Sequence, residues 1–220
     1  MKIRNFCLQH LRLLFSLWVM TAGIAFCVRS HLGSSVISVL PFVFETAGKE
    51  SLAPALTIGQ YTYIINGLLV VGQIFILRRR FPVVQLFQFL IGVIFGMLLD
   101  LNMLLTTWLT PAVWWSQALT QIAGCTILGI GIAIEVRCHS ITMPGEGFPV
   151  AISKITGFEF TNVKIGVDTA LVILGVITCY TFFGAWQWNI VGIGTLFAMF
   201  YVGLVVRIAP RLYERALHLG

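Results

Sequence analysis

The nine residues GIAFCVRSH, at positions 23–31, return as GIAIEVRCH at positions 131–139. Six of the nine positions are identical, and each copy ends a long apolar run. Further along, IGVIFGM at 91–97 matches IGTLFAM at 193–199 in part. The first pair is separated by 108 residues and the second by 102. Two matches in the same order indicate that the chain contains one unit twice, with a shorter connection in the second copy.

The composition places these units in a membrane. The chain has 220 residues, of which 58% are hydrophobic and only 10% are charged, whereas a soluble domain carries about 25% charged residues. So few charges cannot cover a globular surface, so most of the surface is expected to face lipid. A membrane-spanning helix needs ~20 apolar residues. Six runs approach that length: 12–29, 58–77, 83–101, 113–136, 163–183 and 189–206.

Two further apolar pieces are too short to span. Residues 33–46 and 144–157 follow the first and fourth runs and open with Gly or Pro, which predicts short re-entrant or interfacial helices. Each unit then has three spans, and an odd number forces the second unit to insert upside down. The expected fold is all-α: a single polytopic membrane domain over 1–220, built from two inverted three-helix repeats at about 11–101 and about 113–207.

The basic residues predict the orientation. With a cytoplasmic N-terminus, twelve of the fourteen Lys and Arg residues fall on the cytoplasmic side, and only Arg29 and Lys49 fall outside. Cytoplasmic loops carry an excess of Lys and Arg. We therefore expect a multi-pass protein of the bacterial inner membrane, with both termini in the cytoplasm.

One stretch of the second half resembles a known family. The sequence PGEGFPVAISKITGFEFTNVKIGVD (144–168), followed by GIGT (192–195) and preceded by FPVVQ (81–85), is similar to the YitT/YczE-like bacterial membrane proteins. The resemblance covers nearly the whole chain. The longer YitT-type proteins carry a soluble C-terminal domain, so the chain is expected to be of the short YczE type. The family is largely uncharacterised, so the resemblance implies a fold and leaves the ligand open.

Asp168 is the first candidate for a functional side chain. It lies inside the fifth run, where a carboxylate costs at least ~2.5–3.5 kcal/mol on insertion scales. Lys164 precedes it by one helical turn on the same face, and Asn66 is its repeat equivalent at an offset of 102. Asp168 is interpreted as a proton, cation or substrate site. The alternative is a structural ion pair with Lys164 near the interface.

The second group of candidates ends the first run of each half. Arg29 and Arg137 are repeat equivalents, and each precedes a histidine, His31 or His139, by two residues. Both lead into Gly/Pro-interrupted segments, one of which contains Glu146. In inverted-repeat transporters such breaks present helix N-termini to anionic groups. The alternative is that both arginines only reach the lipid headgroups. The two histidines lack a third ligand at metal-binding spacing.

These features predict a transporter. No HExxH, GxSxG, P-loop or dinucleotide-binding motif is present, so we expect no enzyme, metal or cofactor. The basic residues sit at span ends, which argues against nucleic acid. We expect a small secondary transporter that moves an anionic or zwitterionic metabolite by alternating access. The alternative is a non-transporting accessory, scaffold or sensor subunit. The expected partners are the lipid bilayer and a small-molecule substrate, and a homo-oligomer is left open.

Overall fold

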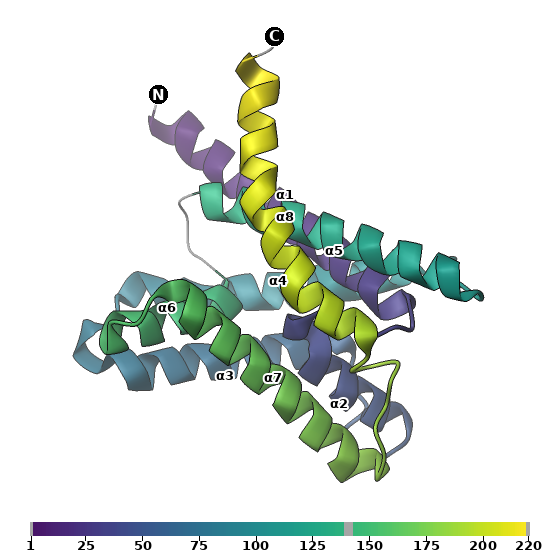
Figure 1. The fold of residues 1–220 in the computed structure, drawn as a ribbon. Helices are drawn as coiled ribbons and strands as arrows, with labels where there is room; N and C mark the ends of the chain where they lie inside the picture. Colours follow the sequence, from purple (N-terminus) through teal and green to yellow (C-terminus); the bar gives the residue numbers. More distant parts are fainter. Residues whose placement is uncertain (1, 139–142, 219–220) are drawn as a thin grey trace.

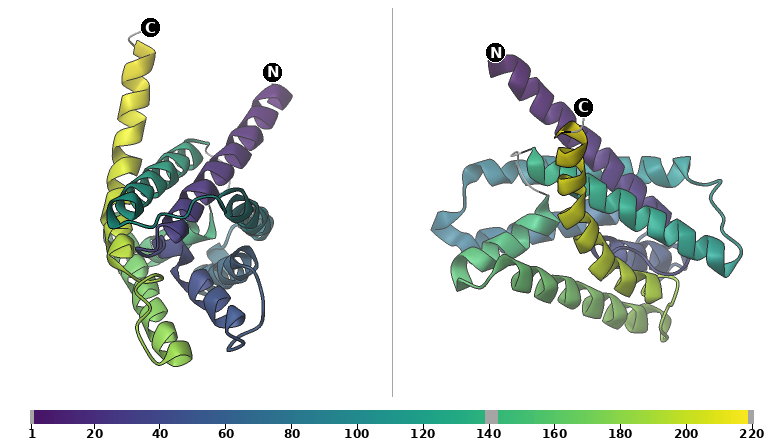
Figure 2. Two further views of the ribbon diagram at one scale, coloured as in Figure 1. Left: turned by 90° about the vertical axis from the view of Figure 1, so that its right-hand side faces the viewer. Right: turned by 45° about the horizontal axis from the view of Figure 1, so that its top comes forward.

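The computed structural model describes residues 2–138 and 143–218, and it is all-α there, with no strand. The described residues form eight α-helices that pack together, and the first and last helices protrude on the same side (Figures 1 and 2). The helices are α1 (Lys2–Arg29), α2 (Val39–Lys49), α3 (Ile58–Leu77), α4 (Phe87–Leu105), α5 (Trp114–Arg137), α6 (Pro144–Thr156), α7 (Phe160–Phe183) and α8 (Ile193–His218). Three short 3-10 turns, η1 (Val36–Ser38), η2 (Arg78–Arg80) and η3 (Val83–Leu86), join them.

Five of the described helices are long and apolar enough to cross a membrane: α1, α3, α4, α5 and α7. Their outer faces carry many exposed large apolar side chains, as expected for helices that contact lipid. The chain is therefore a helical membrane protein. The described apolar part of α8, Ile193–Ala209, is 17 residues long and falls short of the same length limit. The sixth crossing stays a prediction.

The two short apolar pieces are the helices α2 and α6. They contain 11 and 13 residues, which is about 16 and 20 Å of helix at a rise of 1.5 Å per residue. Both are shorter than the ~30 Å hydrocarbon core of a bilayer. Each of them packs against both α3 and α7 (Figure 1).

The largest helix–helix contact joins α1 and α5, which run antiparallel. Gly23 on α1 lies against the backbone of Leu128 on α5, and Gly131 on α5 lies against the backbone of Met20 on α1. A Cβ atom at either glycine would collide with the facing helix. Small residues allow this close approach, which strengthens van der Waals packing where no hydrophobic effect drives association. The repeated GIA motif therefore supplies the contact points of the central helix pair.

A hydrogen-bonded latch closes α3 against α4. Asp100 of α4 accepts a hydrogen bond from Thr57 Oγ1 at 2.6 Å and another from the Gly59 amide at 2.8 Å. The backbone of Gly59 also lies directly against the Gly96 carbonyl. Within the described residues, α7 and α8 show no packing of comparable extent, and they diverge from their connection toward the C-terminus (Figures 1 and 2).

Candidate functional site

Three charged side chains meet where α6 crosses α7. The Lys164 ammonium lies 2.8 Å from an Asp168 carboxylate oxygen and 3.2 Å from a Glu146 carboxylate oxygen. Their side chains are only 14–22% exposed. The Lys164–Asp168 pair is the one expected from their spacing on α7, while Glu146 joins it from α6. One ammonium between two carboxylates leaves the cluster with a net charge of about −1 when all three groups are ionised.

Buried polar groups hold α6 in place beside this cluster. Glu135 near the end of α5 accepts a hydrogen bond from the Met143 amide at 2.7 Å, directly before α6 begins. One turn into α6, Gly147 lies against the side chains of Gln73 and Gln88, which are both fully buried and hydrogen-bonded to each other at 3.0 Å. A Cβ at Gly147 would sit 2.9 Å from Gln73 Oε1, so the amide ends of Gln73 and Gln88 would have to shift to admit a larger residue here.

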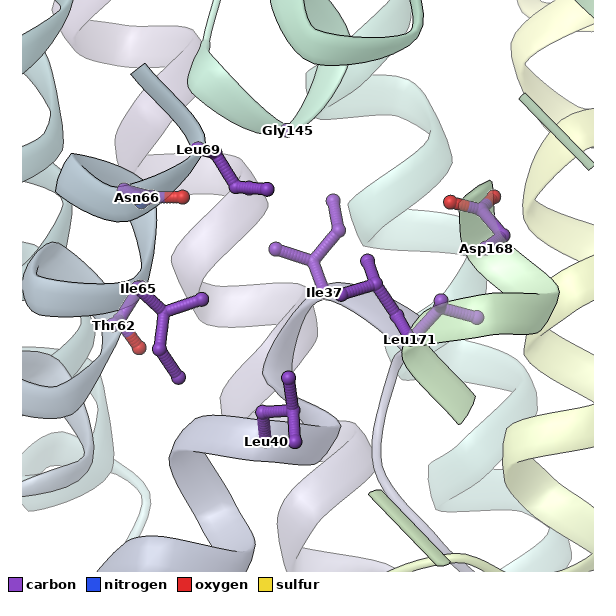
Figure 3. A pocket seen from close by; sticks show the side chains of 10 residues that line it. Ile37, Leu40, Thr62, Ile65, Asn66, Leu69, Gly145, Asp168 and Leu171 are labelled. Carbon is purple, nitrogen blue, oxygen red and sulfur yellow. The ribbon is translucent and has the colours of Figure 1, made fainter. Parts of the chain in front are cut away.

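A small cavity lies between α3 and α7, below the first turn of α6 (Figure 3). Its volume is about 10 Å³, which is about the space for one water molecule. Asn66 faces it from α3 and Asp168 from α7, with apolar side chains between them (Figure 3). Asn66 is 2% exposed, and its Nδ2 has no hydrogen-bond partner among the described residues. The cavity therefore has a carboxylate on the α7 side and the oxygen end of a buried amide side chain on the α3 side (Figure 3).

The lining of this cavity comes in pairs. Asn66 and Asp168, and likewise Leu69 and Leu171, are 102 residues apart. Ile37 and Gly145 are 108 residues apart. These are the two separations found between the matching sequence segments. Residues related by these two separations thus line one cavity, with a polar pair and an apolar pair on α3 and α7.

A larger groove of about 520 Å³ opens between α7 and α8. The three charged residues Glu146, Lys164 and Asp168 line it, together with Arg207 of α8, so that it holds two acidic and two basic side chains. Most of its remaining lining is apolar. Asp168 borders both this groove and the small cavity.

Three residues that line the groove correspond, by the sequence offset of 102, to residues of the hydrogen-bonded latch between α3 and α4. Thr161 and Ala198 line it and are the repeat equivalents of Gly59 and Gly96, whose backbones touch. Val202, which also lines the groove, stands at the position equivalent to Asp100 and cannot accept the latch hydrogen bonds. These positions of α7 and α8 therefore lack both the glycines and the carboxylate that hold α3 against α4.

Residues 7–211 match a family of unknown function, DUF6198. The chain belongs to this family. No curated protein and no solved structure matches this DUF6198 chain. The residues of the site, which all lie inside the matched range, are therefore interpreted from their geometry alone.

The remaining residues predicted for the site lie apart from the Asn66–Asp168 cavity. Arg29 donates a hydrogen bond from Nη2 to the Met103 carbonyl at 2.8 Å and so ties the end of α1 to α4. His31 is exposed, with a backbone φ of 59°. Arg137 is exposed at the end of α5. His139 lies outside the described residues. In this DUF6198 chain neither Arg29 nor Arg137 lines the cavity or the groove beside Asp168.

Sequence reasoning did not identify Gln73, Glu135 or Arg207 as parts of the site. The sequence could have indicated Gln73, because it follows Asn66 by seven residues and so lies on the same face of α3. Glu135 is a lone carboxylate near the end of an apolar run, which resembles an ordinary interfacial residue. Arg207 reaches the groove only because α8 diverges from α7. In the described part of the chain, no group of three or more His, Cys, Asp or Glu side chains is arranged to hold a metal ion.

Proposed function

We propose that this protein is a small secondary transporter that works by alternating access. The observation that carries the proposal is the difference between the two halves at one equivalent place. Asp100 latches α3 to α4, whereas a groove of about 520 Å³ separates α7 from α8 and leads to Asp168. In transporters built from inverted repeats, one half is closed while the other is open, and exchange of the two conformations moves the site from one side to the other.

The proposal includes the two inverted three-helix repeats. The contact of Gly23 with Leu128 and that of Gly131 with Met20 are the same contact under the offset of 108. The packing pairs also correspond: α1 with α4 and α5 with α8, α2 with α3 and α6 with α7, α3 with α6 and α7 with α2. Antiparallel equivalents related in this way support a pseudo-two-fold axis in the membrane plane, with α2 and α6 as the short helices of the two halves.

The charges of the groove favour a zwitterion over a purely anionic metabolite. The two carboxylates of Glu146 and Asp168 can receive an ammonium group, and Arg207 can receive a carboxylate or phosphate. Arg29 and Arg137, which would add positive charge, lie elsewhere. Buried charges in a membrane protein commonly mark a substrate or ion path. We therefore propose a small zwitterionic metabolite, with Asp168 and Asn66 at the inner end of its path.

The orientation is part of the same proposal. With both termini and the Arg78–Arg80 turn in the cytoplasm of a bacterial cell, the groove beside Lys164 and Arg207 faces inward. The excess of basic residues on that side supports this arrangement. The likeness of residues 144–168 to the YitT/YczE-type proteins supports a bacterial inner membrane as the location.

Uptake into proteoliposomes tests the proposal. Purified protein is reconstituted and assayed with radiolabelled alanine, glycine betaine and 4-aminobutyrate, and with acetate as an anionic probe. We expect uptake of at least one zwitterion. Gly203→Trp should abolish it, because Gly203 lines the groove and faces open space that an indole would fill.

Gly166→Trp is the matched control. Gly166 lies on α7, is exposed and also faces open space, but it does not line the groove. This variant should transport like the wild type. Equal loss of uptake in both variants would remove the groove as the path. Absence of uptake of all four probes by folded wild-type protein would instead favour the accessory or sensor subunit.

A further inference from the structure

The groove between α7 and α8 has a buried apolar floor. Leu128 and Ile132 of α5 and Ala198 of α8 line it, and all three are buried. Phe160 of α7 and Phe200 of α8 line it as well, but both rings are exposed, Phe200 to 74%. The groove therefore has apolar side chains both at its base, within the packed helices, and at its open edge.

The charged groups of the groove indicate that it is filled by water rather than by lipid. Two acids and two bases line the same space: Glu146, Asp168, Lys164 and Arg207. Charged side chains are costly in hydrocarbon, and in membrane proteins they usually face the bundle interior or a water-filled cavity. Apolar walls in contact with water are in turn unfavourable. An occupant that covers the apolar walls and also matches the charges is therefore favoured over water and over a lipid chain.

The apolar wall that α8 contributes is long compared with a small zwitterion. Arg207 follows Ala198 by nine residues, which is about 13 Å along the helix. Val202 and Val206 lie between them in the sequence and also line the groove. A zwitterion with only a methyl side chain, such as alanine, covers little of this wall. Each further methylene group that is buried there raises the affinity by up to about fourfold.

We propose that the transported zwitterion is an α-amino acid with an aliphatic side chain. Its ammonium group binds to the two carboxylates beside Lys164, and its carboxylate binds to Arg207. Its side chain lies along the α8 wall from Ala198 to Val206. This inference rests on the proposed function, because it takes the α7–α8 groove as the path of the transported molecule. It adds the substrate class, since the charges alone do not distinguish a long aliphatic side chain from a methyl group.

A binding series that adds one methylene at a time tests the inference. The full chain in lipid nanodiscs is incubated with radiolabelled norleucine, which is displaced by unlabelled alanine, 2-aminobutyrate, norvaline or norleucine. These four compounds share their charged groups, and we expect the inhibition constant to fall about two- to fourfold with each methylene. Pentylamine and hexanoate, which each lack one charge of norleucine, should displace it at least about tenfold more weakly, because one charge-assisted contact is lost.

Three variants locate the side-chain site. Gly203 lines the groove and faces open space, so Gly203→Val fills part of the apolar wall without a collision. It should weaken norleucine about tenfold and alanine less, because the place of two or three methylenes is taken. Phe200→Ala removes an exposed ring from the edge and should make the series less steep. Gly166→Val, at an open position of α7 outside the groove, should leave all four inhibition constants unchanged.

Several results would overturn the inference. Norleucine could fail to bind, or the four amino acids could bind equally. Hexanoate could match norleucine, which would indicate an apolar anion, and lysophosphatidylethanolamine could displace norleucine far better than norleucine itself, which would indicate a lipid. Uptake of alanine together with a flat binding series would overturn this inference and leave the transport function in place. The expected series without uptake in proteoliposomes would support the amino-acid site and overturn transport.

Discussion

At the scale of single residues, Lys164 has two carboxylates within 3.2 Å and can lose one of them without becoming an isolated charge. An unpaired buried charge is strongly destabilising, typically by ~3–5 kcal/mol. Glu146 comes from α6 and Asp168 from α7, so the cluster also joins two helices. The two carboxylates differ in one respect that matters for function: Asp168 borders the small cavity as well as the groove, whereas Glu146 borders only the groove.

This difference leads to a prediction for Asp168→Asn. The variant keeps the shape of the side chain, and Lys164 keeps Glu146 as its partner, so its melting temperature in detergent should stay within a few degrees of the wild type. Uptake of the transported zwitterion should be lost or should lose its dependence on pH, because the carboxylate at the cavity has gone.

Glu146→Gln is the control with the same change of charge. It should fold as well and retain more uptake than Asp168→Asn. Full activity in the double variant Lys164→Met, Asp168→Asn would contradict a functional role for Asp168, since that variant removes the ion pair as a unit.

Some of these residue contacts were predictable from the sequence and others were not. Lys164 and Asp168 pair because they are one turn apart on one helix. Asn66 and Asp168, which the offset of 102 relates in the sequence, line the same cavity. Glu146 meets Lys164 only because α6 folds back onto α7, which depends on the path of an unmatched connection. Arg29 instead reaches the Met103 carbonyl, because a long side chain at a helix end has several partners within reach.

At the scale of helices, two contacts that the sequence offsets relate place their glycine on opposite partners. On α6 the small residue is Gly147, and it faces Gln73 of α3. At the equivalent contact, the small residue is Gly175 of α7, and it faces Val39 of α2. The offsets of 108 and 102 relate Val39 to Gly147 and Gln73 to Gly175. The glycine of the contact can therefore lie on either of the two helices, provided that the other helix carries the larger side chain.

This exchange predicts the outcome of a double substitution. Gly147→Val should lower the free energy of unfolding by ~1–3 kcal/mol, because the new side chain collides with Gln73 and Gln88. Adding Gln73→Ala makes room for it and copies the arrangement of Val39 and Gly175, so part of the stability should return. Thermal unfolding in detergent measures both.

Gly166→Val checks that the loss comes from the collision. Its site is open, so its cost should be small. A double variant no more stable than Gly147→Val alone would show that the two contacts are not equivalent.

The residues at which helix α3 begins and ends agree with those predicted from hydropathy. Residues 58–77 were predicted as a span, and α3 is Ile58–Leu77. Thr57 caps that helix through its side chain, and Gln60 returns the hydrogen bond. Helix α4 was predicted to begin at residue 83. It begins at Phe87, because Pro82 and the 3-10 turn η3 precede it. Apolar patterning cannot separate a 3-10 turn from the first turn of an α-helix.

At the scale of the whole molecule, the proposed orientation makes two loops face opposite sides of the membrane. Lys49, at the end of α2, is expected outside, and Arg79, in the η2 turn, is expected inside. The Lys49 side chain is 66% exposed and Arg79 is also exposed, so a cysteine at either position can react. Cys27, Cys125, Cys138 and Cys179 are buried.

Labelling of intact cells with a membrane-impermeant maleimide tests this orientation. With Cys7 replaced by Ser in both variants, Lys49→Cys should be labelled at once, and Arg79→Cys only after the cells are permeabilised. Labelling of Arg79→Cys in intact cells would reverse the orientation, and with it the side on which the α7–α8 groove opens.

The latch between α3 and α4 also bears on how the chain is made. Thr57, Gly59, Gly96 and Asp100 all lie in the first half of the sequence, so this hairpin can close while the second half is still on the ribosome, where domains generally fold N-terminal part first. The main contact of helix α1, in contrast, joins parts of the chain that are made at different times. Its glycine-containing face packs against α5, which is synthesised after α4. Biogenesis therefore leaves the close-packing face of α1 uncovered until α5 has been made, and a membrane chaperone would have this face to shield.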